Sequence, residues 1–546
     1  VYFKTMSSHV NANESECPVC GNVNPDQILQ IIEAKMVDDA GKYTNERKIK
    51  PKQWYKLYKK NIEKKEEEDE YFAPERKLPR NYFKIPDINK QFRIFSIRNL
   101  LSKLTDKQYL TVNLLEAPAL AFVLAYFTKY VTESGYIFSD NKNLPAYLFM
   151  SIVVALFMGL TVSAEEIIKD RKILERESFL NLSRFSYLNS KIVFLFILSA
   201  IQTGLYVLTG NSILEIKGML LSHWFILFTT ACWANMVGLN ISSGLNSVVT
   251  IYILIPFILV PQLLLSGTIV HFDDLHKSLT NKVYVPLVGD LMVSKWSYEA
   301  LAVNQFKNNE YDKIFFEYDR KISCANYNTT FVIPELQTKL SESSRLLDTE
   351  DNTKKQKLAA NLELLQHEIF EVANKAGVPP FEFINRIRPG GFTKEIASEA
   401  HDYLIYVKMN LSEQSRTLNN RKDSVFNHLI EKFGKESVLQ LKQDYHNKSL
   451  FDMVTDRNEI NKILEINNRL IRKKDPVFMY PESKIGRAHF YAPVKRLGNE
   501  IFQTFWFNMT VIWIASFLLY ISLYYDILRK IIQYFNSIRL RKQSDS

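Results

Sequence analysis

Six long apolar runs interrupt an otherwise polar chain. They cover Tyr109–Val131, Pro145–Val162, Ile192–Leu208, Met219–Ile241, Val248–Val270 and Gln503–Tyr525. Each run is close to the roughly 20 apolar residues that cross the hydrocarbon core of a bilayer. We therefore expect an all-α membrane protein with six transmembrane helices. Pro256 and Pro261 fall in the fifth run, where neighbouring helices or water must satisfy the carbonyl groups that they free.

The charges beside these runs predict the orientation of the spans. Basic residues crowd before the first span, between the second and third, and after the sixth. The loops Thr132–Leu144 and Thr209–Gly218 each contain a single basic residue. The positive-inside rule then places both termini in the cytoplasm, and we expect a multi-pass membrane protein. The same rule accounts for the net charge of +10 without a nucleic-acid partner.

Two charged segments near the expected cytoplasmic face have helical periodicity. Ile88–Lys107 interleaves apolar and basic residues, which predicts an amphipathic helix that lies on anionic membrane lipids. Ser163–Lys191 lies directly between the second and third spans. Its apolar residues at helical spacing are Ile167, Ile168, Ile173 and Leu174. Short amphipathic helices at this position indicate a surface that receives a cytoplasmic partner.

His271–Ile501 separates the fifth and sixth spans, and we expect it to form a large, mainly helical extracytoplasmic domain. One helical stripe consists of Leu358, Leu362, Leu365, Ile369 and Val372. Gly377 ends this helix, and a second stripe follows a helix cap at Thr393. Further helices are expected over Asp423–Phe433 and Arg457–Lys473. We assign these apolar stripes to the core of the domain itself.

No catalytic constellation occurs in the sequence. It contains no G-x-x-x-x-G-K-[ST] loop to hold nucleotide phosphates and no H-E-x-x-H metal motif. Ionisable residues are rare within the spans, and Glu116 and His223 both lie near span ends. A proton-coupled carrier would place such groups near the bilayer midplane. The sequence therefore favours an external source of energy.

Cys17 and Cys20 form a C-x-x-C pair, which is half of a zinc knuckle. A structural zinc site needs two more ligands, and His9 could supply one of them. The alternative is a reduced cysteine pair in a turn. A thioredoxin-type redox role is disfavoured because no βαβ pattern surrounds the pair.

Three segments carry a resemblance to a known family. They are the amphipathic helix before the first span, the run ESFLNLSRFSYLNSK from Glu177 to Lys191, and PQLLLSGTIV (Pro261–Val270) followed by KWSYEALAVNQF (Lys295–Phe306). Together they resemble the membrane (permease) half of ABC exporters of the ABCG, White-type or type V class, particularly the ATPase–permease fusion proteins of Bacteroidetes. The resemblance implies a location in the bacterial inner (cytoplasmic) membrane and a re-entrant segment at the start of the extracytoplasmic (periplasmic) domain 271–501. The start of the chain, VYFKTM followed by ECPVCGNVNPDQI, is similar to the segment that follows the ATPase domain in those fusions.

The resemblance implies a coupling site on the loop between the second and third spans. A coupling helix would seat in a groove of the ATPase domain, and it would comprise Arg171, Lys172, Glu175, Arg176 and Glu177. Glu165 and Glu166 would join a polar network at the start of this helix.

The resemblance also implies a substrate path. Thr268 and Ile269 would form an exit valve, although Thr268 departs from a strictly apolar pair. A central cavity between the two protomers of a homodimer would be lined by Phe157, Leu160, Val260 and Leu264. Ordinary packing is the alternative role of these four side chains.

These expectations combine into one hypothesis of function. The chain would be the permease of an ATP-driven exporter that moves a lipid-like or amphipathic substrate out of the cytoplasm or inner leaflet. ATP and Mg would bind to an ABC ATPase domain located N-terminal to Val1 in the same polypeptide. The alternative is a membrane-anchored scaffold, signalling or mechanotransmitting protein whose periplasmic domain binds an envelope partner.

The same expectations divide the chain into domains. Residues 1–87 form a cytoplasmic linker, and residues 88–108 form a connecting helix. The first five spans cover 109–270 and include the coupling loop 163–191. The extracytoplasmic domain covers 271–501, and the sixth span with its basic tail covers 502–546.

Overall fold

The computed structural model describes residues 25–37, 43–63, 86–133, 135–177, 182–347 and 351–544, together with residues 3, 6 and 349. The chain divides into two compact units, Val1–Lys84 and Ile85–Ser546. The first unit contains α2 (Pro25–Glu33), the antiparallel strands β1 (Lys35–Val37) and β2 (Tyr43–Arg47), α3 (Pro51–Tyr58) and the π-helical turn η1 (Lys59–Glu63). Cys17 and Cys20 lie outside the described residues, so the zinc site stays a prediction.

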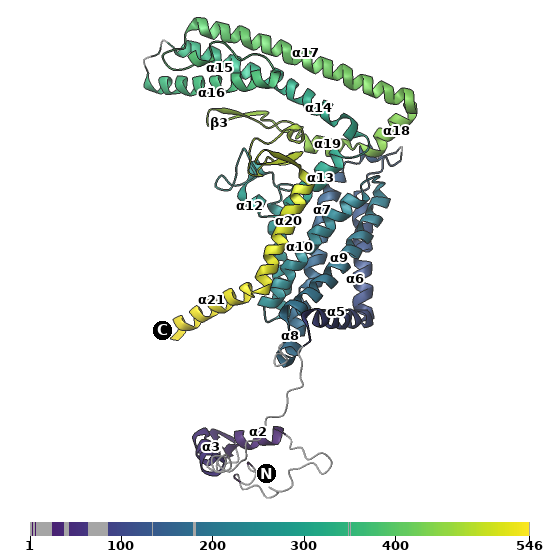
Figure 1. Ribbon diagram of the computed structural model, residues 1–546, viewed down its shortest axis with the longest axis vertical. Coiled ribbons are helices and arrows are strands. Elements are labelled where there is room, and N and C mark those ends of the chain that lie inside the picture. Colours follow the sequence, from purple (N-terminus) through teal and green to yellow (C-terminus); the bar gives the residue numbers. More distant parts are fainter. Residues whose placement is uncertain are drawn as a thin grey trace. The chain divides into compact units, whose positions relative to one another are not determined.

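The second unit contains a bundle of long helices, which Figure 1 shows side by side. Among the described residues, five helices are long and apolar enough to cross a membrane. They are α6 (Lys107–Thr128), α7 (Leu144–Ser163), α9 (Arg184–Leu214), α10 (Leu220–Gly244) and α20 (Thr504–Tyr524). The expected all-α membrane fold is therefore confirmed.

The helix at the fifth expected span is shorter than the apolar run in the sequence. This helix, α11 (Val248–Leu264), has 17 residues, and the chain then turns instead of continuing as a helix to Val270. It packs against α7 and α13 (Val293–Lys307). Ile251 and Ile255 are buried in these contacts, whereas Ile253 and Phe257 are among the apolar side chains of α11 that are exposed. α11 therefore covers one side of the bundle, and its own outer side is not covered by the described part of the chain.

Small residues bring α7 and α10 into close contact at the centre of the bundle. A Cβ atom added to Gly159 would lie 2.6 Å from the carbonyl oxygen of Ala231, and one added to Gly238 would collide with the hydroxyl of Ser163. Close approach between small residues gives membrane helices their van der Waals packing. We infer that α7 and α10 move as one body, with α9, α13 and α20 packed around α10.

Three further helices meet one end of this bundle: α5 (Ile88–Thr105), α8 (Glu166–Glu177) and α21 (Ile527–Ser544) (Figure 1). α5 lies across the end of the bundle and buries Gln91, Phe95 and Asn99, largely against α9. Its exposed apolar residues are Ile88, Ile94, Ile97, Leu100, Leu101 and Leu104. A helix therefore occupies the segment expected to be amphipathic, and its apolar side chains are available to lipid.

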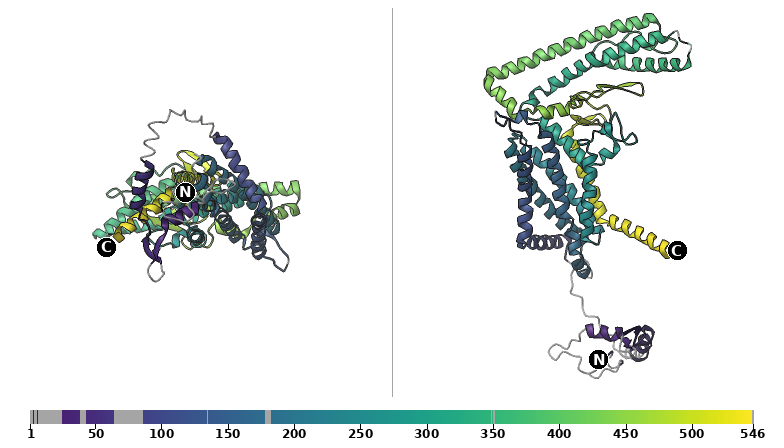
Figure 2. Two further views of the ribbon diagram at one scale, coloured as in Figure 1. Left: turned by 90° about the horizontal axis from the view of Figure 1, so that it is seen from below. Right: turned by 180° about the vertical axis from the view of Figure 1, so that it is seen from behind.

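The opposite end carries a mainly helical domain, whose long green helices are seen most clearly in Figure 2. The short α12 (Leu287–Asp290) comes directly before α13 in the chain. The helices of the domain that follow α13 are α14 (Asp312–Tyr327), α15 (Ile333–Leu346), α16 (Asn352–Ala376), α17 (Lys394–Phe433), α18 (Lys435–Tyr445) and α19 (Lys448–Val454). The predicted stripe residues Leu362 and Ile369 are fully buried in an apolar core of their own. Gly377, with φ of 64°, ends α16, and the Thr393 hydroxyl accepts a hydrogen bond at the start of α17.

The prediction of a helix over Arg457–Lys473 is wrong. This segment contains the antiparallel hairpin of β3 (Ile463–Ile466) and β4 (Arg469–Arg472). Asn467 and Asn468 connect the strands with φ of 51° and 58°, as a two-residue hairpin turn requires. A second hairpin, β5 (Val494–Leu497) and β6 (Glu500–Gln503), leads into α20. Single turns complete the unit: η2 (Phe138–Asp140), η4 (Phe272–Asp274), η5 (Asn328–Val332), η6 (Ile384–Arg386) and η7 (Pro476–Phe478).

Candidate functional site

A buried ion-pair network fixes the start of α8. Glu166 is 3% exposed and accepts from two lysines, Lys103 of α5 and Lys191 of α9. The Lys191 Nζ atom lies 3.0 Å from Glu166 and 2.9 Å from the carboxylate of Asp170. A carboxylate this deeply buried needs such partners because desolvation strongly disfavours an unpaired charge. Glu166 thereby connects three helices at one point.

The rest of α8 is joined to the end of α10. The Ser242 hydroxyl accepts hydrogen bonds from two backbone N–H groups in the first turn of α8, at 3.0 and 3.1 Å. The guanidinium of Arg171 donates to the carbonyl oxygens of Ser243 and Leu245, at 3.0 and 2.9 Å. These carbonyls lie just before α11, so a displacement of α8 would be transmitted directly to the α10–α11 connection.

The remaining predicted coupling residues lie on the outward side of this junction. Lys172, Glu175 and Arg176 are exposed, whereas Glu177 pairs with Arg98 of α5 at 3.1 Å. Glu165 is 18% exposed, pairs with Lys169 one turn later and hydrogen-bonds the Tyr252 side chain of α11, so it lies beside the buried network. α8 therefore offers exposed charged side chains on a helix whose base is rigidly held.

Sequence reasoning missed the partners of Glu166. A signal for Lys191 was present, because a lysine at the edge of an apolar run requires a counter-charge. No signal linked Lys103 to Glu166, since the two residues come from separate helices.

The predicted exit residues lie in the turn after α11. Ile269 is 56% exposed, and the Thr268 N–H donates to the hydroxyl of Ser266 at 3.3 Å. The turn depends on Gly267, which has φ of 80° and lies against the ring of Phe272. A cavity of about 590 Å³ opens beside it, between this turn, Phe272 and the outer domain.

Three of the four predicted cavity residues lie on an exposed apolar surface. Phe157, Val260 and Leu264 are between 39% and 49% exposed. Leu160 is fully buried beside Gly238 in the α7–α10 contact. The structure therefore separates Leu160 from the other three, and Leu160 contributes to packing.

A second buried charge cluster joins α13 to the segment that returns to α20. Glu299 is fully buried, and it accepts from Lys495 of β5 at 2.6 Å and from the Asn508 side chain of α20 at 3.0 Å. Lys295 lies 3.3 Å from the same carboxylate. Burial lowers the pKa of Lys495 to about 8. Burial opposes ionisation of Glu299 too, but the two lysines still hold its pKa below the ordinary value.

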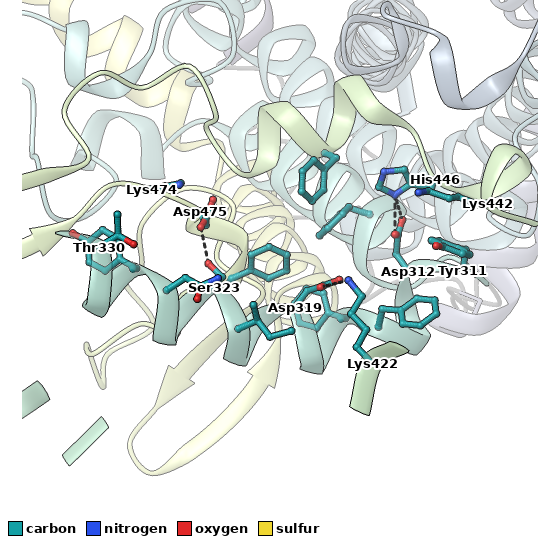
Figure 3. Close-up of a pocket in the computed structure, with 18 of the residues that line it drawn as sticks. Tyr311, Asp312, Asp319, Ser323, Thr330, Lys422, Lys442, His446, Lys474 and Asp475 are labelled. Carbon is teal, nitrogen blue, oxygen red and sulfur yellow. Dashed lines mark hydrogen bonds and ion pairs between the residues drawn. The ribbon is translucent and has the colours of Figure 1, made fainter. Parts of the chain in front are cut away.

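Figure 3 shows a cavity of about 430 Å³ at the base of the outer helices. His446 lies 2.8 Å from the carboxylate of Asp312, and Lys422 pairs with Asp319. Asp475 accepts from the Ser323 hydroxyl at 2.6 Å. Every carboxylate that lines the cavity already has a partner, so these pairs join α14 to α17, α18 and η7. Among the described residues, no group of three His, Cys, Asp or Glu could hold a metal ion.

Comparison with known families finds a likeness for the part of the membrane bundle from α5 to α13. Residues 90–306 match the model of the ABC-2 type transporter family. The match begins in α5, contains the α8 junction and ends in α13. This part of the chain is therefore similar to an ABC-2 type membrane domain, and the likeness supports a permease component of an ABC transporter, which works with an ABC ATPase partner. A comparison with curated proteins finds no match.

Proposed function

We propose that this chain is the permease of a homodimeric ABC exporter of the ABCG-like class, which moves a lipid-like or amphipathic substrate out of the cytoplasm or inner leaflet. ATP and Mg bind to an ABC ATPase domain in the same polypeptide. That domain contacts the exposed side of α8, through Lys172, Glu175 and Arg176. The observation that supports this proposal most is the α8 junction, which connects an exposed charged helix to α5, α9 and α10.

The junction supports a mechanical sequence of events. Closure of the ATPase domains displaces α8. The buried Glu166 pairs carry the displacement to α5 and α9, and Arg171 carries it to the α10–α11 connection. α11 then shifts relative to the α7–α10 pair and changes the turn that contains Thr268 and Ile269. Exposed apolar side chains along α11 suit a substrate with a substantial apolar part.

The test uses the native complex of permease and ATPase, purified from its source and reconstituted in liposomes. We expect Lys172→Ala combined with Arg176→Ala to lower ATP-dependent movement of a fluorescent phospholipid several-fold, with unfolding temperature unchanged. Lys277→Ala, which removes a lysine from the segment after η4 and far from α8, is the matched control and should retain transport. Full transport by the α8 variant would overturn the assignment of α8 as the ATPase contact.

Polar substitutions separate export from the mechanotransmitting alternative. Val260→Asn and Leu264→Asn place amides on the exposed apolar surface of α11 and should impair lipid movement while ATP hydrolysis continues. Unchanged lipid movement with these substitutions would mean that no substrate passes along α11. Absence of ATP-dependent lipid movement in the unsubstituted complex would instead favour the alternative, in which the chain acts on an envelope partner through its outer domain.

A further inference from the structure

α21 presents an apolar stripe that the described part of the chain leaves uncovered. Ile527, Ile531 and Phe535 recur every four residues and are 40%, 47% and 65% exposed. This spacing places them on one side of an α-helix. Large apolar side chains gathered on one exposed face indicate a surface that binds something apolar.

The start of α21 is fixed at the end of the bundle that carries α5 and α8. Asp526, with φ of 51°, breaks the helix between α20 and α21. Its carboxylate accepts from the Ser243 hydroxyl at 2.6 Å and pairs with Arg184 at the start of α9. Leu528 then packs against Gly244. The remainder of α21 leaves the bundle sideways, as the yellow helix in Figure 2 shows.

The charge of α21 indicates what kind of molecule binds its exposed face. The helix contains five basic residues and no acidic residue: Arg529, Lys530, Arg539, Arg541 and Lys542. A helix that combines an apolar stripe with an excess of basic residues suits the boundary between acyl chains and anionic headgroups. α5 has the same combination and lies at the same end, on the opposite side of the bundle (Figure 1).

We propose that α21 is a membrane-surface helix that binds anionic phospholipids. Ile527, Ile531 and Phe535 enter the acyl-chain boundary of the leaflet, and Arg529 and Lys530 contact phosphate headgroups. α5 and α21 then hold the same leaflet on two sides of the bundle, on either side of the α8 junction. The inference depends on the membrane domain alone and is independent of the transported substrate.

The test measures the depth of nitroxide labels on α21 in the full chain. Cys17, Cys20 and Cys324 are changed to Ser, and Cys232 stays because it is fully buried. Labels are placed by Phe535→Cys or Gln533→Cys. Two residues are separated by roughly 200° on an α-helix, so these labels point to opposite sides. The chain is reconstituted in nanodiscs of phosphatidylcholine with phosphatidylglycerol.

We expect the label at position 535 to be several-fold more accessible to oxygen than to a water-soluble nickel complex, and the label at position 533 to show the reverse. Arg529→Gln with Lys530→Gln should reduce this difference, as should nanodiscs of phosphatidylcholine alone. High nickel access at both positions would overturn the proposal, because α21 would then lie in water. Exclusion of both quenchers at position 535 would also overturn it, because a second copy or the ATPase domain would then cover the stripe.

Discussion

Glu166 is the residue on which the α8 junction depends most. Glu166→Gln would remove the paired carboxylate of Lys103, which is 15% exposed. It would also leave Lys191, which is 7% exposed, with Asp170 alone among the carboxylates that the structure describes near it. Removing one member of a buried ion pair leaves an uncompensated charge, so we expect a loss of about 3 kcal/mol in the free energy of unfolding. Thermal unfolding of the detergent-solubilised protein measures this loss.

The neighbouring Glu165 provides the matched control. Glu165 is 18% exposed and its partner Lys169 is 62% exposed, so solvent screens this pair more than the Glu166 pairs, and such a pair contributes about 1 kcal/mol or less. Glu165→Gln should therefore leave the unfolding temperature nearly unchanged. Equal losses from the two substitutions would contradict the central position of Glu166.

His489 makes the stability of the outer domain sensitive to acid. Burial lowers its pKa to about 4, and its ring donates to the carbonyl oxygen of Pro476 at 2.8 Å. The unfolded chain binds a proton at this histidine below its ordinary pKa of 6.5, whereas the folded chain does not. Stability is therefore complete above pH 6.5 and is lost as the pH falls towards 4.

We expect His489 to account for about 1–2 kcal/mol of lost stability between pH 7 and pH 5. His489→Gln keeps a hydrogen-bond donor for Pro476 and removes the titration. Unfolding measured at both pH values should show a smaller acid loss in the variant than in the native chain. Parallel pH profiles would mean that His489 does not titrate as described.

Single residues could be predicted from the sequence only where the signal was local. Glu166 was found beside an apolar run, but its partner Lys103 is 63 positions away. Leu160 shared the apolar character of Phe157, and only the close α7–α10 contact distinguishes a buried leucine from an exposed phenylalanine. Pairing across helices depends on tertiary geometry, which periodicity does not specify.

At the scale of elements, the cluster at Glu299 connects α13, β5 and α20. Glu299→Gln would leave Lys295 and Lys495, each 1% exposed, as two buried cations without this carboxylate. Lys495→Met would keep the pair between Lys295 and Glu299. We expect a loss of about 4 kcal/mol for the first change and a clearly smaller loss for the second.

The order of these two losses is the informative result. Chemical unfolding of both variants beside the native chain measures it, and the same solubilised preparation serves for all three. A larger loss from Lys495→Met than from Glu299→Gln would mean that the cluster is held by the lysine from β5. The connection between the outer domain and α20 would then depend on that strand.

Elements were predicted well where periodicity was sustained. The stripes of α16 and α17 repeat over many turns, and Gly377 and Thr393 mark their ends by well-understood backbone chemistry. The apolar residues of Arg457–Lys473 repeat too few times to distinguish a helix from strands. The pair Asn467 and Asn468 was the local signal for a hairpin turn. The sequence could not show that α11 ends at Leu264, because the apolar run continues to Val270. An apolar turn and an apolar helix have the same composition.

At the scale of the whole molecule, the sequence predicted the membrane bundle and the large insertion, because both follow from the order of apolar and polar segments. The proposed assembly of two copies depends instead on which apolar faces remain uncovered. On α11 the exposed apolar residues are Val249, Ile253, Phe257, Val260 and Leu264. Both lipid and a second copy could satisfy such a face, so a measurement must separate them.

We expect Val260→Cys to form a covalent dimer when membranes containing the full chain are treated with a mild oxidant. Residues near the two-fold axis of a symmetric dimer lie opposite their own copies, and α11 packs against α7 and α13 on one side while its other side is exposed and apolar. Ile197→Cys on α9 is the matched control, since Ile197 is 57% exposed and lies on a different face. Both variants carry Ser at Cys17, Cys20 and Cys324. Cross-linking at neither position, or equally at both, would mean that α11 faces lipid, and the permease would then require a different dimer surface or act as a single copy.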